Sequence, residues 1–253
     1  MNALRAAQRI GASMTDAGTG SRSVRVSVSG LTKRFDRRNV LRSIDLQLYS
    51  GERVALLGSN GAGKTTLLRV ISTLSRPTTG TVRINGVALN EAPQEARRHV
   101  GVVAHQPYLY DDLTAIENLR FFARMYAVPD ERNRIDEVLD LVGLGSRTRD
   151  RVQTFSRGMQ QRLAIARAIL HRPDLLLLDE PDTGLDREGM HVLERILEHH
   201  VTGGGTALMT THDLRFGLTS GDRVLLLEFG RLTLDSPARE LVEEELDARL
   251  SRR

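Results

Sequence analysis

The sequence predicts an α/β fold in which a block of helices is set inside a chain of strands. Three observations predict it. A short apolar run at 53–57 precedes a glycine-rich loop and a helical pattern. Helical spacing of apolar residues dominates residues 107–171, and strand-sized apolar runs return after that block, the first at 175–178. Together these segments indicate a single α/β domain over residues 23–253.

The first 106 residues contain an extension and a series of short strands. Residues 1–22 are rich in Ala, Gly, Ser and Thr and have no sustained hydrophobic period, so we expect a disordered extension. Apolar residues then alternate with polar ones or form short runs, which is typical of half-buried and buried strands. A basic turn at 36–39 and the turn pair Asn85-Gly86 separate some of them. The predicted strands cover 24–28, 44–48, 53–57, 81–84 and 100–104.

The helical block is predicted from caps and from apolar residues at helical spacing. Thr114 with Glu117 three residues later has the pattern of a capping box, so a helix begins there. A second helix ends at Gly143, and a third begins at Ser156 and ends before Pro173. After the block we expect strands at 175–178, 206–210 and 223–227, a helix at 190–201, and a charged amphipathic helix at 237–253.

The stretch 58–66 fits the phosphate-loop pattern G-x-x-x-x-G-K-[ST], between the required strand and helix. Glycines let backbone N–H groups converge on phosphate oxygens, and the helix N-terminus points its positive end at them. Lys64 is one of only two lysines, and it supplies a compact charge for the β- and γ-phosphates, while Thr65 supplies a hydroxyl for Mg²⁺. The alternative is a chance glycine-rich turn. The candidate phosphate-binding residues are Gly58, Ser59, Asn60, Gly61, Ala62, Gly63, Lys64, Thr65 and Thr66.

Two carboxylates, Asp179 and Glu180, follow the leucine run at 175–178. Open α/β sheets bind their ligands at the carboxyl ends of the strands, which is where this pair stands. Asp179 is therefore placed to hold Mg²⁺, directly or through water. Glu180 is free to polarise an attacking water as a general base. A capped strand end without chemistry is the alternative.

Composition limits the classes of function. The chain has 40% hydrophobic residues, enough for a core, and no cysteine, which excludes disulfides and thiolate metal sites. No run approaches the roughly 18 apolar residues of a membrane span, and the N-terminus lacks the apolar region of a secretory signal. We therefore expect a cytoplasmic protein. The net charge of +4 allows a surface for lipid headgroups or nucleic acid. A solvated, arginine-rich surface is the plainer alternative, and the few aromatic residues argue against a nucleic-acid partner.

These motifs, in this order, resemble the ATP-binding subunit of ATP-binding cassette (ABC) transporters over residues 24–235. The resemblance implies a RecA-like P-loop ATPase core with an N-terminal antiparallel β subdomain and an inserted helical subdomain. The family signature Leu-Ser-Gly-Gly-Gln corresponds to Phe155-Ser-Arg-Gly-Met, which retains Ser156 and Gly158 and has Met159 in place of Gln. In the family this helix start binds the γ-phosphate of ATP held by a second subunit. Met159 removes one polar side-chain contact at that point.

The resemblance implies further roles for single residues. Phe35 matches the aromatic residue that stacks on adenine, with a core phenylalanine as the alternative. Asp186 lies in the loop that crosses the dimer interface. Gln106 matches the glutamine that joins Mg²⁺ and the nucleophilic water to the helical block. His212 matches the switch histidine that contacts the γ-phosphate, with a structural histidine as the alternative. The implied ligands of Mg²⁺ are Thr65, Gln106 and Asp179.

Two segments, 105–122 and 154–162, are similar to the ATP-binding subunit of heme exporters of cytochrome c maturation. Related signatures also occur in other single-cassette exporters of drugs, lipids or polysaccharides, which remain the alternative. The resemblance implies an ATP-dependent homodimer on an integral membrane permease, bound peripherally at the cytoplasmic face of the membrane. We expect four residues to line a groove for a permease helix, with helical-block core as the alternative. They are Tyr108, Leu109, Tyr110 and Leu113.

Two other classes of function stay open from sequence. A non-transport ABC protein acting on nucleic acid or the ribosome usually carries two cassettes or a long coiled coil, and this chain has one signature. A nucleotide-switched interaction module would not need useful hydrolysis. The pair of Glu180 and His212 argues against that module.

Overall fold

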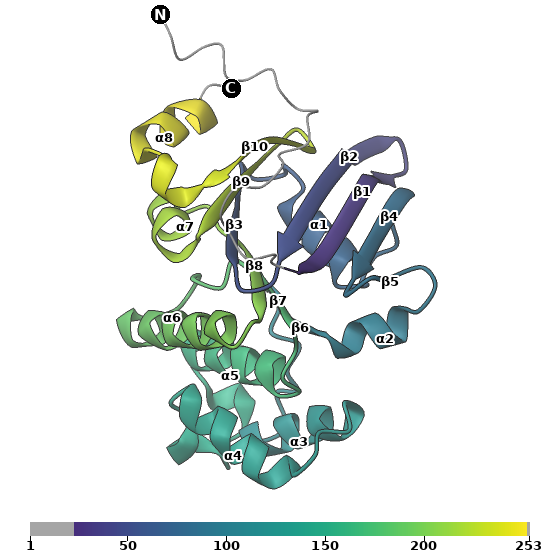
Figure 1. The fold of residues 1–253 in the computed structure, drawn as a ribbon. Coiled ribbons are helices and arrows are strands. Elements are labelled where there is room, and N and C mark those ends of the chain that lie inside the picture. The colour runs from purple at the N-terminus through teal and green to yellow at the C-terminus, as the bar shows by residue number, and fades with distance from the viewer. Residues whose placement is uncertain (1–22, 252–253) are drawn as a thin grey trace, which may run out of the picture.

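The structure is a computed structural model that describes residues 23–251 (Figure 1). The expected extension at 1–22 lies outside the described residues. The strands form two sheets, and the helices pack around them. Within the described range no helix combines the length and the apolar character that crossing a bilayer requires.

Four strands form an antiparallel sheet in the order β2-β1-β4-β5. They are β1 (Val24–Phe35), β2 (Arg38–Tyr49), β4 (Thr79–Ile84) and β5 (Val87–Ala88). Strand β1 is longer than the predicted 24–28 because it continues through register shifts around Leu31 and pairs with β2 as far as its end. The predicted basic turn at 36–39 is therefore only two residues long, since β2 already begins at Arg38.

Six strands form the second sheet, in the order β10-β9-β3-β8-β7-β6. They are β3 (Arg53–Leu57), β6 (Val100–Val103), β7 (Leu175–Asp179), β8 (Thr206–Thr210), β9 (Arg223–Glu228) and β10 (Arg231–Pro237). All neighbours in this sheet are parallel except β10, which runs antiparallel to β9. The carboxyl ends of β3, β8 and β7 therefore meet at one edge. That edge positions the candidate site.

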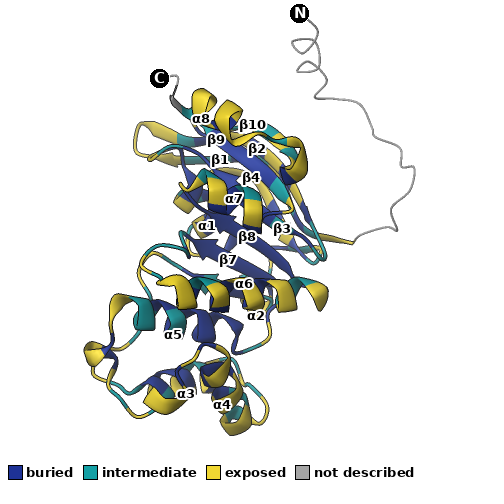
Figure 2. Cartoon of the chain, turned by 90° about the vertical axis from the view of Figure 1, so that its left-hand side faces the viewer, coloured by how far each residue is buried: buried dark blue, intermediate teal, exposed yellow. Residues whose placement is uncertain are grey.

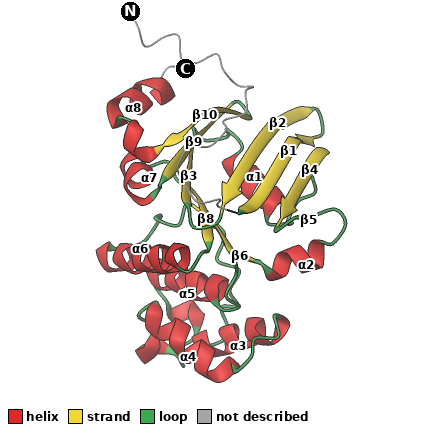
Figure 3. Ribbon diagram, viewed as in Figure 1, coloured by secondary structure: helices red, strands yellow, loops and turns green. Residues whose placement is uncertain are grey.

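The helices fill the remaining space, and α3, α4 and α5 gather at the end far from the antiparallel sheet (Figures 1 and 3). The capping box predicted at Thr114 is present at the start of α3. Three single-turn 3₁₀ helices occur at Gly145–Arg147, Val152–Thr154 and Ala238–Glu240. The α-helices are α1 (Lys64–Ile71), α2 (Pro93–Arg98), α3 (Ala115–Met125), α4 (Glu131–Leu141), α5 (Arg157–Ile169), α6 (Arg187–Thr202), α7 (Leu214–Ser220) and α8 (Glu243–Ser251).

The predicted helix at 237–253 is wrong at its start. Pro237 ends β10, where it pairs with Arg223 of β9, and α8 begins only at Glu243. The sequence pattern also missed β5, β10, α2 and α7. β5, α2 and α7 are short, and short elements depend on tertiary contacts more than on their own propensity, whereas β10 is seven residues long but forms only by pairing with β9.

The central strands of the six-stranded sheet, β3, β7, β8 and β9, are buried on both faces, as the dark interior of Figure 2 shows, whereas the edge strand β10 is partly exposed. Leu175 and Leu177 of β7 belong to the cluster shared with α1 and the antiparallel sheet. Leu176 and Leu178 belong to the cluster shared with α5, α6 and the helices below them. A strand buried on both faces reads as an unbroken apolar run, which is why this strand was evident from sequence.

Candidate functional site

The phosphate loop lies between β3 and α1, and its glycines adopt backbone angles that other residues avoid. Gly58, Gly61 and Gly63 have φ angles of 154°, 79° and 113°. A Cβ on Gly58 would collide with the carbonyl oxygen of Leu227 in β9, so only glycine fits there. Gly63 is the N-cap of α1, whose first N–H groups have no partner within the helix. The loop and helix together form a cradle for phosphate.

Lys64 places a positive charge inside this cradle. The side chain is buried, and Nζ donates to the carbonyl oxygens of Gly58 at 2.6 Å and Ser59 at 3.4 Å. Burial lowers the pKa of Lys64, and the nearby charges of Glu180 and Asp179 partly offset that effect. The ammonium therefore lies near both the loop and the two carboxylates.

Asp179 lies at the edge of the sheet where the carboxyl ends of β3, β8 and β7 meet. Its Oδ1 accepts hydrogen bonds from Thr65 Oγ1 at 3.0 Å and from Thr210 Oγ1 at 2.7 Å. Thr65 follows β3, Thr210 ends β8 and Asp179 ends β7, so the parallel order brings the three together. Thr210 was not among the predicted site residues. Its signal was a polar residue at the carboxyl end of a buried strand.

The oxygen atoms around Asp179 fit Mg²⁺. This ion prefers oxygen ligands and is usually held by one or two carboxylates together with substrate phosphates and water. The Thr65 hydroxyl and the Asp179 carboxylate already lie within hydrogen-bonding distance. No group of three His, Cys, Asp or Glu residues suited to a metal occurs between residues 23 and 251. Gln106, the third predicted ligand, is exposed in the loop after β6, and within that range no hydrogen bond joins its side chain to the other two.

Glu180 adopts an unusual backbone conformation directly after the end of β7. Its φ angle of 52° is left-handed, which costs about 1–2 kcal/mol for a residue with a side chain. Two hydrogen bonds hold it there, from its N–H to the carbonyl oxygen and the hydroxyl of Thr210, at 3.1 and 3.0 Å. Its Oε2 lies 3.8 Å from Nδ1 of His212. Asp179 thus stays buried, while Glu180 is partly accessible beside the predicted histidine.

The loop between Glu180 and α6 contains buried polar groups that the sequence did not reveal. Asp182 accepts a hydrogen bond from Thr211 Oγ1 at 3.2 Å, and burial raises the pKa of Asp182. Its other oxygen and the hydroxyl of Thr183 are buried without a partner among the described residues. Asp186 caps α6, since its Oδ1 accepts the Gly189 N–H at 2.7 Å. Unpaired buried groups are rare, so this loop is built to meet a further polar group.

The signature segment begins α5. Ser156 caps the helix, with Oγ accepting the N–H of Met159 at 3.2 Å. A Cβ on Gly158 would lie 3.1 Å from the carbonyl oxygen of Gly184, so this helix start packs closely on the loop before α6. The Met159 side chain packs against the cluster shared with the lower helices. Helices α1 and α5 belong to opposite faces of the six-stranded sheet, and no hydrogen bond between described residues joins the signature to the phosphate loop.

A hollow of about 420 Å³ brings Glu180 and the start of α5 to one place. Gln161 crosses beneath it and donates to the Pro181 carbonyl oxygen at 3.4 Å. His105 lies in its wall, although the sequence assigned no role to that residue. The lining residues are His105, Pro107, Arg157, Gln160, Gln161, Glu180 and Thr183.

Phe35 stands at the end of β1, beside the hairpin turn into β2. Its side chain is 49% exposed, so the alternative of a core phenylalanine is wrong. Lys33 Nζ lies 4.7 Å from the centre of the ring. Stacking on adenine stays a prediction.

The predicted groove residues have mixed surroundings. Tyr108 and Tyr110 are 47% and 49% exposed. Leu109 packs against the helical cluster, and Leu113 is half-buried. The exposed pair is available for a partner, whereas the two leucines mainly support the loop.

This chain is similar to known proteins in both sequence and structure. Residues 41–183 match the model of the ABC transporter family. An uncharacterized ABC transporter ATP-binding protein, YdbJ of Bacillus subtilis (strain 168), is 42% identical over 207 residues, covering 81% of this chain and 67% of the relative. The Nod factor export ATP-binding protein I of Cupriavidus metallidurans (strain CH34) is 34% identical over 223 residues, covering 87% and 74%.

The fold is also similar to a solved structure. That solved structure is the dimer of the ATP-binding cassette MJ0796 in a post-hydrolysis state, bound to ADP and Pi. The TM-score is 0.77 at 29% identity, covering 85% of this chain and 99% of the other. The predicted fold class is therefore confirmed.

Proposed function

Because this chain belongs to the ABC transporter family, as an ATP-binding subunit that hydrolyses ATP, we propose that it powers an exporter. The observation that carries the proposal is the arrangement at the sheet edge. Lys64 and Thr65 stand beside Asp179, and Glu180 faces outward with His212 beside it. The relative named for Nod factor export supports the exporter class.

Each residue of the site has its own role in ATP hydrolysis. The N–H groups of the phosphate loop and the Lys64 ammonium bind the phosphates. Thr65 and Asp179, with Gln106, would hold Mg²⁺, which would supply charge neutralisation for the phosphates. Glu180 accepts a proton from the attacking water. His212 contacts the γ-phosphate and orients Glu180. The barrier falls mainly through positioning and charge neutralisation.

The complete site needs two copies of the chain. Ser156 and Gly158 lie on the face of the sheet opposite α1, so they serve the nucleotide of a second subunit in a head-to-tail dimer. The dimeric cassette MJ0796 supports this arrangement. Asp186 lies in the loop that crosses the interface. ATP favours the closed dimer because it contacts both subunits, and loss of the γ-phosphate removes that differential affinity.

Glu180→Gln tests the assignment of the base. The variant keeps the shape of the side chain and loses its basicity, so turnover should fall about 10²- to 10⁴-fold while ATP still binds. Dimer should accumulate with ATP. Steady-state phosphate release and size-exclusion chromatography with and without ATP measure both effects.

Glu198→Gln is the matched control, since Glu198 is exposed on α6 away from the loop. It should turn over at the wild-type rate. Normal turnover by Glu180→Gln would refute the base.

The exporter proposal includes a permease at the cytoplasmic face of a membrane. We place its docking surface at a groove of about 150 Å³ beside α3, lined by residues that include Tyr108, Phe122 and Arg167. Of the four residues expected from sequence, only Tyr108 belongs to this lining. The Arg167 guanidinium lies 5.7 Å from the Tyr108 ring and 5.2 Å from the Phe122 ring. This arrangement stiffens an aromatic surface that a permease helix would cover. We also take about 107–171 as one helical subdomain within a single domain at 23–253.

Heme is the cargo that residues 105–122 and 154–162 favour, through their likeness to heme exporters. The relative named for Nod factor export supports the alternative, an exporter of another compound. Affinity purification from membranes of the native cell tests both, with the integral subunits and bound heme identified. Heme-exporter subunits with heme support the first cargo, and other permeases support the second. A chain that copurifies with nucleic acid instead, in a salt-sensitive manner, is a non-transport ABC protein.

A further inference from the structure

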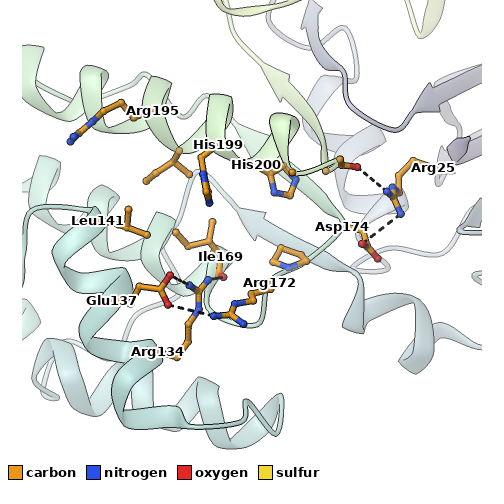
Figure 4. A pocket seen from close by; sticks show the side chains of 15 residues that line it. Arg25, Arg134, Glu137, Leu141, Ile169, Arg172, Asp174, Arg195, His199 and His200 are labelled. Atoms are coloured by element: carbon orange, nitrogen blue, oxygen red, sulfur yellow. Dashed lines mark hydrogen bonds and ion pairs between the residues drawn. The ribbon is translucent and has the colours of Figure 1, made fainter. Parts of the chain in front are cut away.

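A cavity of about 660 Å³ opens at the edge of the sheet opposite the phosphate loop (Figure 4). Its walls include Arg25, Asp174 and Gly205, which stand at or next to the amino ends of β1, β7 and β8. The remaining wall comes from α4, α6 and the end of α5. Small-molecule sites have volumes of roughly 300–1,000 Å³. The cavity therefore has the size of a ligand site and is separate from the ATP site.

Positive groups predominate in the lining. Four arginines stand against two carboxylates, which gives a formal charge of 4 − 2 = +2 before the histidines are counted. Two histidines, one of them exposed, add to the polar wall. The charged and titratable lining residues are Arg25, Arg134, Arg172, Arg195, His199, His200, Glu137 and Asp174.

Two of the arginines are already committed to the fold. Arg25 donates to the Gly204 carbonyl oxygen at 3.0 Å and pairs with Asp174 at 3.6 Å. Arg134 donates to the carbonyl oxygens of Ile169 and Leu170, at 2.6 and 3.0 Å, and also pairs with Glu137. These bonds neutralise both carboxylates and the carbonyl end of α5. The negative groups of the cavity wall therefore already have arginine partners that belong to the same wall.

The other two arginines are left in excess. Arg172 has a side chain that is 72% exposed, and its only ion pair among the described residues, at 3.6 Å, is with the Glu137 that Arg134 already holds. Arg195 is exposed on α6 and has no ion pair within residues 23–251. His199 follows one turn later on the same helix face and points into the cavity in Figure 4. Figure 4 draws Arg195 and Arg172 on different walls of the cavity, so each adds its own unneutralised positive charge to the space between them, which favours a bound anion.

The cavity also has an apolar part. Leu141 on α4 is 41% exposed, although it is a large aliphatic side chain. Ile169 and Ile196 line the same space, and Pro173 adjoins Arg172. An apolar surface beside unneutralised arginines suits a molecule with one charged and one apolar end.

We propose that this cavity binds a small amphipathic anion. Its carboxylate, sulfonate or phosphate is held by Arg172, and the unpaired charge of Arg195 on the other wall attracts it from a greater distance. Its apolar part covers Leu141, Ile169 and Ile196. Since α4 supplies one wall and α6 another, the bound anion ties the lower helices to the sheet.

The test uses 1-anilinonaphthalene-8-sulfonate, an aromatic sulfonate whose fluorescence rises on binding, with saturating ADP present to occupy the nucleotide site. We expect one saturable site per chain. Decanoate should displace the probe, whereas decyltrimethylammonium, a cation of the same chain length, should not. Arg172→Asn should weaken binding about tenfold, the typical effect of one lost charged hydrogen bond, and Arg195→Gln should weaken it by a smaller factor because that charge acts from the other wall. Asparagine suits the left-handed backbone at Arg172, where φ is 53°.

Arg239→Gln is the control, because Arg239 is exposed and lies outside the cavity. It should bind the probe as the wild type does. Decanoate at 100 times its Kd should also raise the unfolding midpoint of the wild type by about 5–10 °C, and the two cavity variants should show less of this rise. Equal affinity in the cavity variants and the wild type, equal displacement by the cation, or no saturable binding up to about 1 mM each overturn the proposal.

Discussion

Single residues in this protein matter most where the backbone or burial leaves no room for another side chain. Gly58 touches β9 so closely that a methyl group has no space. Glu180 holds a left-handed backbone directly after the buried Asp179, and its own side chain is 25% exposed. His171 is enclosed between α5 and β6 and is stacked on Tyr126, with ring centres 3.9 Å apart. Each of these positions yields a separate test.

Gly58→Ala should disrupt the phosphate loop. The added methyl group meets the Leu227 carbonyl oxygen, so the loop must shift and ATP binding should fall at least tenfold. A fluorescent ATP analogue measures the affinity. Gly30→Ala is the control, because Gly30 also has positive φ, at 58°, but a Cβ there meets nothing within 4 Å. Wild-type ATP affinity in Gly58→Ala would show that the close approach to β9 is unimportant.

His171 should make the free energy of unfolding depend on pH. Burial lowers the pKa of His171 to about 4, with Arg134, Arg167 and His99 adding repulsion and the Val100 carbonyl opposing the shift. The unfolded state, with a histidine pKa near 6.5, binds more protons between these values. The part of the free energy of unfolding that depends on neutral His171 is therefore fully present above pH 6.5, and it is lost as pH falls toward 4. We expect a loss of about 2 kcal/mol between pH 7.5 and 5.

Urea unfolding of the wild type and of His171→Phe at several pH values measures this contribution. Phenylalanine keeps the stack on Tyr126 and cannot be protonated. All other titrating groups are shared, including His200, whose pKa burial also lowers, so they cancel in the difference. The same pH dependence in both proteins would contradict the assignment.

At the scale of elements, the site depends on how strands end and helices begin. β7 and β8 end in the site residues Asp179 and Thr210, and the phosphate loop follows the end of β3. Helices α1, α5 and α6 begin at residues predicted to contact nucleotide or the dimer partner. Helix starts carry free N–H groups and a positive dipole end, so a nucleotide enzyme gathers them around its substrate. Caps elsewhere in the chain serve stability alone.

Thr114→Ala should remove such a stabilising cap. The threonine Oγ1 accepts the Glu117 N–H at 3.3 Å, and Glu117 reaches back to the Thr114 N–H at 2.8 Å. Loss of an N-cap costs about 1 kcal/mol of unfolding free energy, measured by urea titration. Thr114→Ser keeps the hydroxyl and should remain within a few tenths of a kcal/mol of the wild type. Equal stability of the alanine and serine variants would show that the cap contributes nothing.

At the scale of the whole molecule, one sheet separates three surfaces with different tasks. Its carboxyl edge holds the phosphate loop and the carboxylates. Its amino edge opens into the arginine-lined cavity. The helical end carries the exposed aromatic residues that the exporter proposal assigns to a permease. Closure at the first surface can be transmitted to the last because β6 leads from the sheet directly into the loop of Tyr108.

Tyr108→Ser should separate docking from ATP binding. The side chain is 47% exposed, so its loss should leave the fold and ATP affinity unchanged while reducing copurification with the permease. Phe229→Ser is the control, since Phe229 is 81% exposed but lies at the β9–β10 turn. A double variant of Tyr108 and Leu109 gives a second test. If it still copurifies with the permease and keeps its ATPase activity, the docking assignment is wrong.

Much of the fold and site could be predicted because the signals are local. The spacing from Gly58 to Thr65, the carboxylates after a run of leucines, and the pair Thr114 and Glu117 each involve only a few neighbouring residues. Backbone geometry over such short spans depends on residue type, so the sequence alone determined the phosphate loop, the strand before Asp179 and the helix caps.

Contacts between segments that are far apart in the sequence were decided by the tertiary structure alone. Thr210 meets Asp179 only because β8 lies between β3 and β7. Pro237 ends a strand rather than starting a helix because β9 offers it a partner. The cavity exists because α4, α6 and the amino ends of β7 and β8, separate in sequence, are brought side by side. No local pattern encodes these meetings, since each arises from packing between segments that the chain brings together only on folding.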